Sequence, residues 1–334
     1  MILFTISDAS QVSEVRRGAV AIATRAGFDE EDSGRVALVA TELATNISRH
    51  AQRGEILVGL FSDASGDGVE LIAIDQGPGI RNIGNAMEDG FSTAGSSGHG
   101  LGAIKRLSDD FSVLSIVQIG TAVSTRLRAR HSGTGNPRAP WAGIDAPKPG
   151  EESCGDSWAA FADANRQDRT DIIMVADGLG HGPEAAIAST EAARLFSANL
   201  GASPTEILEI IHDGIRHTRG AAVSIARFDY ERRVVVFAGI GNVAGVLLSG
   251  GQAKRMVCHN GTVGLNARRI QAFEYPFIGT PTVVLHSDGL SNSWVVDRYP
   301  GLLTAPPTMI AATLFRDNKR DRDDMTIVVG SGAP

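Results

Sequence analysis

The segment Asp171-Ile-Ile-Met-Val-Ala-Asp177-Gly-Leu-Gly-His-Gly-Pro183 joins an apolar run to a glycine-rich turn and then to a proline. Residues 171–176 have the length and composition of a buried strand, and Asp177 stands at its end. Pro183 suits the first turn of a helix reaching about Asn199, because the N–H group that proline lacks has no partner there. This segment therefore predicts a mixed α and β domain with a carboxylate at the end of a strand.

Further acidic residues follow the same pattern across the second half of the chain. They lie in Gly155-Asp-Ser-Trp158, Ser287-Asp-Gly289 and Arg322-Asp-Asp-Met-Thr326, which supply Asp156, Asp288, Asp323 and Asp324. An Asp-Gly pair alone is more often a turn than a ligand. Four acidic motifs in this order at strand ends are far rarer by chance. Several carboxylates around one water are what two-metal phosphate-ester hydrolysis requires, and such ligands favour Mg²⁺ or Mn²⁺.

These motifs, with Ala238-Gly-Ile-Gly-Asn242 and Asn260-Gly-Thr-Val-Gly264, resemble the type 2C metal-dependent protein phosphatases, in particular their SpoIIE/RsbX branch. The resemblance spans about residues 150–330. It implies an α-β-β-α sandwich with two Mn²⁺ or Mg²⁺ ions at one edge. It also implies that Asp177 bridges both ions, that the Gly178 carbonyl binds one, and that Asp288 and Asp323 complete the cage. Asp324 is the adjacent alternative to Asp323, and Asp156 is a further candidate. His181 is interpreted as a residue that structures its loop.

A different chemistry is indicated in the first half. Glu42 and Asn46 are four residues apart and share one face of a helix predicted over residues 32–51. That face is offset from the apolar stripe that includes Leu43 and Ile47, so both side chains can line a cleft. An asparagine oxygen suits Mg²⁺, and a glutamate is able to take a proton from an attacking hydroxyl. An isolated Glu/Asn pair is usually just a solvated helix face.

Two glycine-rich loops favour a binding cleft at this helix face over a solvated surface. Asp75-Gln-Gly-Pro-Gly79-Ile follows a strand predicted over residues 69–74, and its carboxylate can accept from an exocyclic amine such as that of adenine. Gly77 and Gly79 allow the backbone to approach a base. Gly98-His-Gly-Leu-Gly102 then precedes a helix predicted over residues 101–108. Unhindered N–H groups before a helix form a phosphate cradle. The predicted nucleotide contacts in this second loop are Gly98, Gly100, Leu101 and Gly102.

The ordered set of these motifs resembles the GHKL (Bergerat) ATP-binding fold over roughly residues 10–129. Glu88-Asp-Gly-Phe-Ser-Thr-Ala-Gly95 and Lys105-Arg-Leu107 are similar to the RsbT-type switch kinases. The resemblance implies that Glu42 is the catalytic base, Asn46 the ligand of the Mg²⁺ that accompanies ATP, and Asp75 the adenine reader. It implies phosphorylation of a Ser or Thr on a small STAS-domain partner. No phosphoacceptor-histidine helix is apparent ahead of this region, which argues against a histidine kinase.

Residues 131–150 are rich in Gly and Pro and lack an apolar period, so they are interpreted as a linker. This gives an α+β protein with two domains, residues 1–130 and 151–334, which suits a length of 334 residues.

A net charge of −7 argues against nucleic-acid binding. Cys154 and Cys258 lie far apart and are interpreted as ordinary thiols. Neither a signal peptide nor an apolar run long enough to span a membrane is seen, so a cytoplasmic protein is expected.

Together the two resemblances imply a bifunctional partner-switching regulator. One domain would phosphorylate a STAS-domain protein with Mg·ATP, and the other would hydrolyse a phosphoserine or phosphothreonine. A sigma-factor or stressosome-like assembly is the expected setting. In the alternative, the GHKL domain binds ATP or a partner and gates the phosphatase without transferring phosphate. The oligomeric state stays open.

Overall fold

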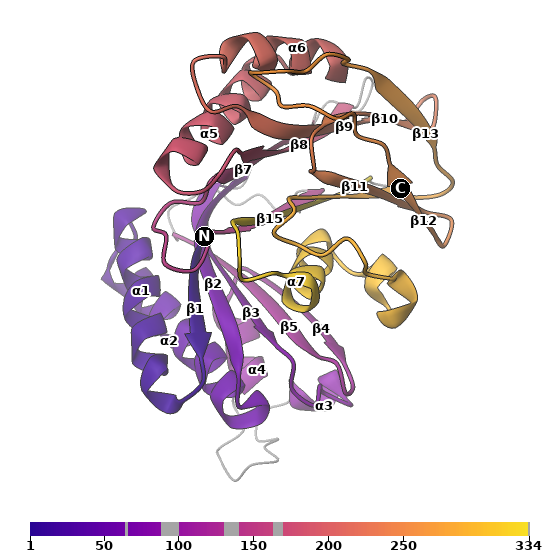
Figure 1. Cartoon of the computed structure of the whole chain (residues 1–334). Helices are drawn as coiled ribbons and strands as arrows, with labels where there is room; N and C mark the ends of the chain where they lie inside the picture. The colour runs from indigo at the N-terminus through magenta and orange to yellow at the C-terminus, as the bar shows by residue number, and fades with distance from the viewer. Residues whose placement is uncertain (64–65, 88–99, 130–139, 163–169, 333–334) are drawn as a thin grey trace. The chain divides into compact units, whose positions relative to one another are not determined.

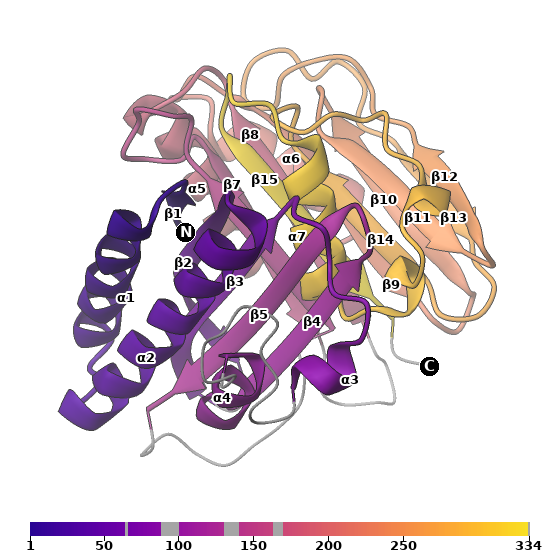
Figure 2. The ribbon, with the colours of Figure 1, turned by 90° about the horizontal axis from the view of Figure 1, so that it is seen from below.

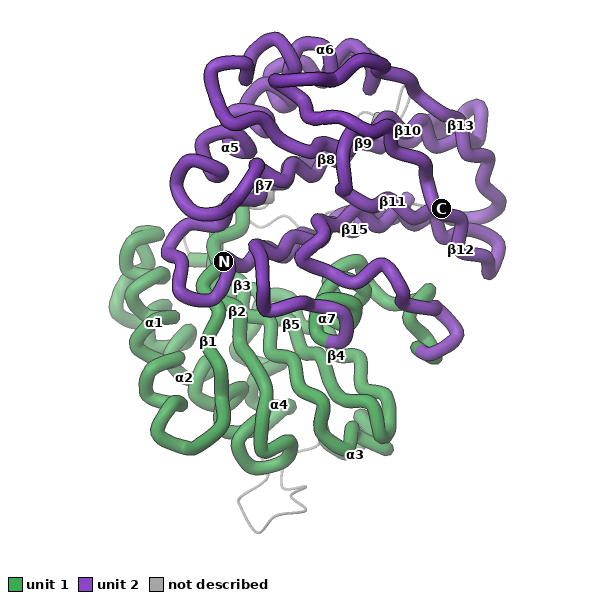
Figure 3. Tube along the Cα trace, viewed as in Figure 1, with its two compact units in different colours: residues 1–138, 299–316 green, residues 139–298, 317–334 purple. Residues whose placement is uncertain are grey.

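A computed structural model describes residues 1–63, 66–87, 100–129, 140–162 and 170–332, with the side chains of Asp63 and Thr170 left out. Two compact units divide the chain (Figure 3). Unit 1 comprises Met1–Arg138 and Tyr299–Arg316, and unit 2 comprises Ala139–Arg298 and Asp317–Pro334.

Unit 1 is built on a five-stranded antiparallel sheet with the order β1-β2-β3-β5-β4. Its strands are β1 (Ile2–Ile6), β2 (Gly54–Asp63), β3 (Gly66–Asp75), β4 (Asp110–Ile116) and β5 (Gly120–Arg128). Its helices are η1 (Ala9–Gln11), α1 (Val12–Arg25), α2 (Glu30–Asn46), η2 (Ile47–Ala51), α3 (Ile83–Ala86) and α4 (Gly100–Leu107). The helices predicted over residues 32–51 and 101–108 and the strand predicted over residues 69–74 are present, with small shifts at their ends.

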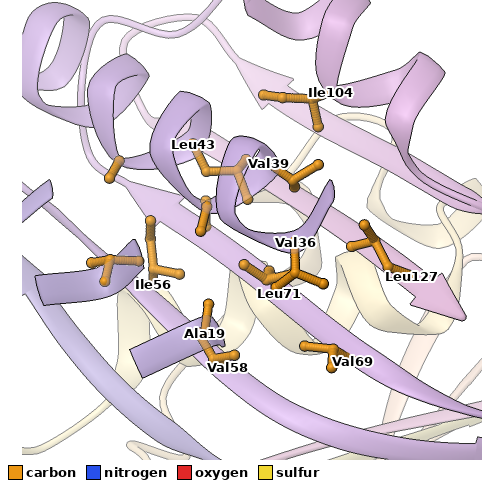
Figure 4. Packing of buried hydrophobic residues seen from close by; sticks show 14 of the residues in the cluster. Ala19, Val36, Val39, Leu43, Ile56, Val58, Val69, Leu71, Ile104 and Leu127 are labelled. Atoms are coloured by element: carbon orange, nitrogen blue, oxygen red, sulfur yellow. The ribbon is translucent and has the colours of Figure 1, made fainter. Parts of the chain in front are cut away.

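The core of unit 1 lies between the sheet and the helices α1, α2 and α4 (Figures 1 and 2). The stripe of Val36, Val39 and Leu43 on α2 faces Ile56 and Leu71 of the sheet (Figure 4). Alternate residues of the strands point to this core because successive side chains of a strand lie on opposite faces. The apolar period on α2 therefore fixes which sheet face the helix covers.

The other face of this sheet is also buried, since Leu57, Ile72 and Ile74 on it are almost fully inaccessible. Segment Tyr299–Arg316 belongs to the same unit and contains η4 (Leu302–Thr304) and most of α7 (Pro307–Asn318). Eight consecutive residues of α7, Met309–Arg316, are buried. A helix buried all round has apolar contacts on more than one side. The sequence interpretation missed α7, and the segment falls outside the predicted boundary of the first domain at residue 130.

Unit 2 contains two five-stranded antiparallel sheets, with orders β13-β10-β9-β8-β7 and β12-β11-β14-β15-β6. The strands of the first sheet are β7 (Asp156–Ala162), β8 (Thr170–Gly178), β9 (Ala221–Asp229), β10 (Val234–Ile240) and β13 (Ala272–Pro276). Those of the second are β6 (Trp141–Ala146), β11 (Ala244–Ser249), β12 (Gln252–Met256), β14 (Thr282–His286) and β15 (Met325–Ser331). The unit's helices are α5 (Pro183–Ala198), α6 (Pro204–Gly214) and the 3-10 turn η3 (Val296–Arg298).

Strand β8 shows how the layers of unit 2 are formed. Ile172 and Met174 pack in the core shared with α5 and α6, whereas Ile173 and Val175 pack in the core between the two sheets. Both faces of β8 are therefore apolar, as its unbroken hydrophobic run predicted. Its last residues, Asp177 and Gly178, lie at the edge of this sandwich.

The predicted linker is partly wrong, because residues 141–146 form strand β6. This strand pairs with β15, from Ala146 opposite Met325 to Trp141 opposite Gly330. Only six residues long and containing Gly143 and Asp145, the strand carries a weak signal in a segment otherwise rich in Gly and Pro. Strand β12 was not predicted, because it is only five residues long and mostly exposed.

Among the described residues, no helix combines the length and apolar composition needed to cross a bilayer.

Candidate functional sites

The candidate nucleotide site begins at the end of α2. Asp29 caps this helix by accepting the N–H of Asp32 at 2.8 Å, and the apolar stripe seats it on the sheet. Glu42 and Asn46 are half-buried and lie one turn apart. Directly after Asn46 the helix widens into a π-helical turn, η2. Turns of this kind are rare and are frequent at functional sites. Sequence periodicity could not reveal this turn, because five residues are too few to show a change of helical period.

Asp75 lies at the end of β3, where the first glycine loop starts. Its Oδ1 atom accepts the N–H of Gly77 at 2.8 Å. Burial raises the pKa of the Asp75 carboxyl, against the opposing effects of the Gly77 N–H and the positive charge of Arg316. A side chain on Gly77 would start 2.8 Å from Cβ of Ala51 in η2. The loop therefore packs directly against the turn that follows Asn46, and only glycine fits there.

The start of α4 completes this arrangement. A side chain on Gly100 would start 3.0 Å from Oδ1 of Asn46, so the first turn of α4 lies against that amide. Leu101 and Gly102 are buried beneath it. Gly79 has a φ of +70° and lies close to the backbone of Ile116, which again requires glycine. Gly98 and the motif of residues 88–95 lie outside the described residues.

The candidate metal site is formed where β7 and β8 end side by side. Asp156 and Asp177 are directly opposite each other in this antiparallel pair. A side chain on Gly178 would start 2.1 Å from the carbonyl oxygen of Ala185 in α5, and the Gly178 N–H donates to the Gly155 carbonyl. The strand register and the first turn of α5 thus fix the direction of Asp177.

The second sheet brings the remaining carboxylates to the same place. The Ser287 N–H donates to the Thr326 carbonyl and the Thr326 N–H donates to Oγ of Ser287, both at 3.0 Å. These bonds join the end of β14 to the start of β15. Asp288 follows the first residue of this pair, and Asp323 and Asp324 precede the second. A side chain on Gly155 would start 2.5 Å from Oδ2 of Asp324, so residues more than a hundred positions apart in sequence are neighbours here.

The electrostatics show that these carboxylates are close enough to repel one another. Burial, followed by the charges of Asp156 and Asp288, raises the pKa of Asp177 to about 9. Burial, with repulsion from Asp324, raises the pKa of Asp156 to about 7. Oδ2 of Asp156 and Oδ2 of Asp324 are buried and accept no hydrogen bond from any residue that the structure describes. Together these carboxylates form a set of oxygen donors.

This donor set fits a divalent cation, because carboxylate oxygens are the ligands that Mg²⁺ and Mn²⁺ prefer. Within the described ranges, however, no three His, Cys, Asp or Glu side chains already stand in an arrangement that could hold a metal ion. The carboxylates share one neighbourhood, and their side chains would have to turn toward an ion.

Asp323 and Asp324 differ in their contacts. Asp324 is buried, and its Oδ1 accepts the N–H of Lys148 at 2.8 Å. Asp323 is half-buried, and its Oδ1 accepts the N–H of Asp324. Asp324 thus anchors the segment that leads from β6 to β7. Sequence reasoning missed this anchor, because nothing in the sequence pairs Lys148 with a residue so distant.

Other residues in this part of the chain make the following contacts. His181 is exposed, and its Nδ1 lies 2.7 Å from Oε1 of Glu151. Arg320 donates weakly to the Asp288 carbonyl at 3.4 Å. Nδ2 of Asn242 donates to Oδ2 of Asp288 at 2.5 Å, although its motif had received no role of its own. Cys154 and Cys258 are free thiols, as predicted.

Comparisons with known proteins match the two parts of the chain separately. Residues 5–127 match the histidine kinase-like ATPase domain, and residues 167–330 match the stage II sporulation protein E (SpoIIE) family. The serine/threonine-protein kinase RsbT of Bacillus subtilis (strain 168) is 43% identical over 102 residues, which cover 30% of this chain and 77% of that protein. The phosphoserine phosphatase RsbX of the same organism is 28% identical over 184 residues, which cover 55% of this chain and 89% of that protein.

A crystal structure of RsbX in complex with magnesium has the same fold as part of the chain, with a TM-score of 0.50 and 22% identity, over 58% of this chain and 94% of that one. The predicted fold class, two α+β domains with an ATPase-like fold followed by a PPM-type phosphatase fold, is confirmed. The chain therefore belongs to the RsbT family of histidine kinase-like ATPase domains through its first part, and a SpoIIE-family phosphatase domain of the PPM type follows in the same chain.

Proposed function

We propose that the chain is a bifunctional regulator of a partner-switching pathway, with a protein kinase in its first part and a metal-dependent protein phosphatase in its second. The acceptor would be a Ser or Thr of a STAS-domain protein in a sigma-factor or stressosome-like assembly. Two relatives, a serine/threonine kinase and a phosphoserine phosphatase, support this pairing, since the chain covers 77% and 89% of their lengths.

The phosphatase proposal rests above all on the acidic cluster around Asp177, whose carboxylates raise one another's pKa. Asp177 would bridge two divalent ions, with the Gly178 carbonyl, Asp288 and Asp323 as further ligands and Asp156 beside them. When bound, such ions lower the pKa of a water molecule and offset the charge of the phosphoryl oxygens. In the hydrolysis a water oxygen would bond to phosphorus, the bond from phosphorus to the Ser or Thr oxygen would break, and that oxygen would leave with the proton that the water gives up. No phosphoenzyme is needed.

The phosphatase is tested with the full-length chain, Mn²⁺ and a generic phosphoester. Asp177→Ala and Asp288→Ala should each abolish hydrolysis. Asp213→Ala is the matched control, because Asp213 is an exposed carboxylate on α6 paired with Arg216. If Asp177→Ala and Asp288→Ala both hydrolyse the phosphoester at the wild-type rate, the assignment of these residues as metal ligands is wrong.

The kinase proposal rests on the contact between Gly100 and Asn46. This contact brings a helix N-terminus, a place that favours phosphate, against a side chain suited to Mg²⁺. Asp75 would hold the exocyclic amine of adenine. Glu42 would take the proton of the acceptor hydroxyl. The hydroxyl oxygen would bond to the γ-phosphorus as ADP leaves. Positioning the hydroxyl in line with the γ-phosphate is the main task of such a site.

Incubation with γ-labelled ATP and a candidate STAS-domain protein tests the transfer. Label should accumulate on the partner most visibly in the Asp177→Ala background, where removal of phosphate is blocked. Glu42→Gln should lose the transfer and keep ATP binding. If ATP binds to the wild-type chain but no label reaches any partner, the ATPase-like domain is a regulatory module that gates the phosphatase.

A further inference from the structure

The turn between β10 and β11 is held in place by several backbone hydrogen bonds. The Gly241 N–H donates to the His259 carbonyl at 2.9 Å, and the His259 N–H donates to the Gly239 carbonyl at 2.8 Å. On the other side, the Val243 carbonyl accepts from Oγ of Ser224 at 3.0 Å. Asn242 lies between these anchors, so its backbone has little freedom.

The same turn is tied to the strand next to Asp177. Gly241 has a φ of +95°, and a side chain there would start 2.4 Å from Cβ of Ala222. Ala222 is directly opposite Asp177 in the β8–β9 pair. The turn therefore approaches the strand residue that pairs with Asp177, and only glycine permits this approach.

From this fixed position the side chain of Asn242 reaches Asp288. Its Nδ2 atom donates to Oδ2 of Asp288 at 2.5 Å, while both residues remain exposed to solvent. Asn242 and Asp288 are 46 positions apart, so the contact exists only in the folded sheet arrangement. The amide is neutral. It orients one carboxylate oxygen without cancelling the negative charge that a cation would use, whereas a lysine or arginine at this place would compete with the cation.

We propose that Asn242 is a positioning residue that holds the Asp288 carboxylate ready for the divalent cation of the phosphatase site. The inference rests on the proposed phosphatase function and adds to it a residue with no predicted role. Carboxylates that bind metals are themselves commonly hydrogen-bonded, and loss of such a partner typically weakens metal affinity by about 10- to 100-fold. Asn242 acts through Asp288 and touches neither the substrate nor the reacting atoms.

The test measures the dissociation constant of Mn²⁺ with the full-length chain, by calorimetry and by the electron paramagnetic resonance signal of free Mn²⁺. Asn242→Ala should raise the dissociation constant by about 10- to 100-fold, with the melting temperature of the metal-free protein unchanged. Asn242→Gln, which keeps the amide on an exposed side chain, should restore part of the affinity. Phosphoester hydrolysis by Asn242→Ala should need more Mn²⁺ and approach the wild-type kcat at saturation.

Asn199→Ala is the matched control, because its Nδ2 also donates a hydrogen bond, but to the Leu195 carbonyl at the far end of α5. It should leave Mn²⁺ affinity unchanged. A dissociation constant of Asn242→Ala within threefold of wild type, beside clear weakening in Asp288→Asn, would overturn the role of Asn242 and leave the phosphatase site intact. A wild-type chain that binds no Mn²⁺ would overturn both proposals.

Discussion

Replacing Asp177 with asparagine should stabilise the metal-free protein at neutral and alkaline pH. The folded pKa of Asp177 is raised to about 9 from the ordinary 3.8 by burial and by the neighbouring charges. The folded chain therefore holds a proton that the unfolded chain releases above pH 4. A raised carboxyl pKa gives stability that is complete below the unfolded pKa and is lost as pH rises toward the folded pKa. Stability of the metal-free protein should thus fall between about pH 4 and pH 9.

The magnitude follows from the same values. One pKa unit corresponds to about 1.4 kcal/mol, so roughly three units between 3.8 and pH 7 give at most about 4 kcal/mol. Asp156 shares this repulsion, and its own pKa is raised to about 7. We therefore expect asparagine at position 177 to gain about 2 kcal/mol at pH 7–8, which is roughly 4–8 °C for a unit of this size.

Tryptophan fluorescence is a selective assay, because all three tryptophans, Trp141, Trp158 and Trp294, belong to unit 2. The wild-type melting temperature without metal should fall from pH 5 to pH 8, and that of Asp177→Asn should fall less. With Mn²⁺ at about 100 times its dissociation constant, the wild type should gain about 2.7 kcal/mol and the variant little. A wild-type melting temperature that is the same at pH 5 and pH 8, or a variant less stable throughout, would refute the reasoning.

Three further predictions concern single contacts. Gly100→Ala places a methyl group 3.0 Å from Oδ1 of Asn46. It should weaken binding of a fluorescent ATP analogue roughly tenfold, about 1.4 kcal/mol, and unchanged affinity would count against the pocket. Gly143→Ala places a methyl group 2.2 Å from the Trp158 ring. It should cost about 1–3 kcal/mol in urea unfolding, whereas Gly201→Ala, with open space around it, should not. Glu70→Gln removes the partner of Arg126, whose Nε lies 2.8 Å from Oε1 in a mostly buried pair. It should destabilise unit 1 by about 3 kcal/mol in circular dichroism melts, and a loss below about 1 kcal/mol would show that the pair is solvated.

Much of each unit could be predicted from the sequence, because the signals involved are local. The apolar stripe containing Val36, Val39 and Leu43 predicted α2, and residues 171–176 predicted the buried part of β8. The spacing of apolar residues shows which face of a helix or strand is apolar. A short stretch of sequence is enough to show this spacing. The order of the motifs was equally accessible, and it predicted the two families that the comparisons later matched.

The missed features depend on partners distant in the chain. Residues 141–146 look like a linker until β15 supplies hydrogen bonds from near the other end of the sequence. Helix α7 is buried along eight consecutive residues, which include the polar Thr313 and Arg316, so no polar face marks it in the sequence. The π turn after Asn46 covers only five residues, which is too short for a change of helical period to show in the sequence.

The sequence by itself determined which residues are the candidates for the chemistry: Glu42, Asn46 and Asp75 in one part, and Asp156, Asp177, Asp288 and the Asp323–Asp324 pair in the other. Only the tertiary structure decided how those residues meet. It set Asp156 opposite Asp177, joined Ser287 to Thr326, and aimed Asn242 at Asp288. The physical reason is that residue type fixes charge and hydrogen-bonding capacity, whereas proximity is fixed by strand register and packing, which arise only when the whole sheet has formed.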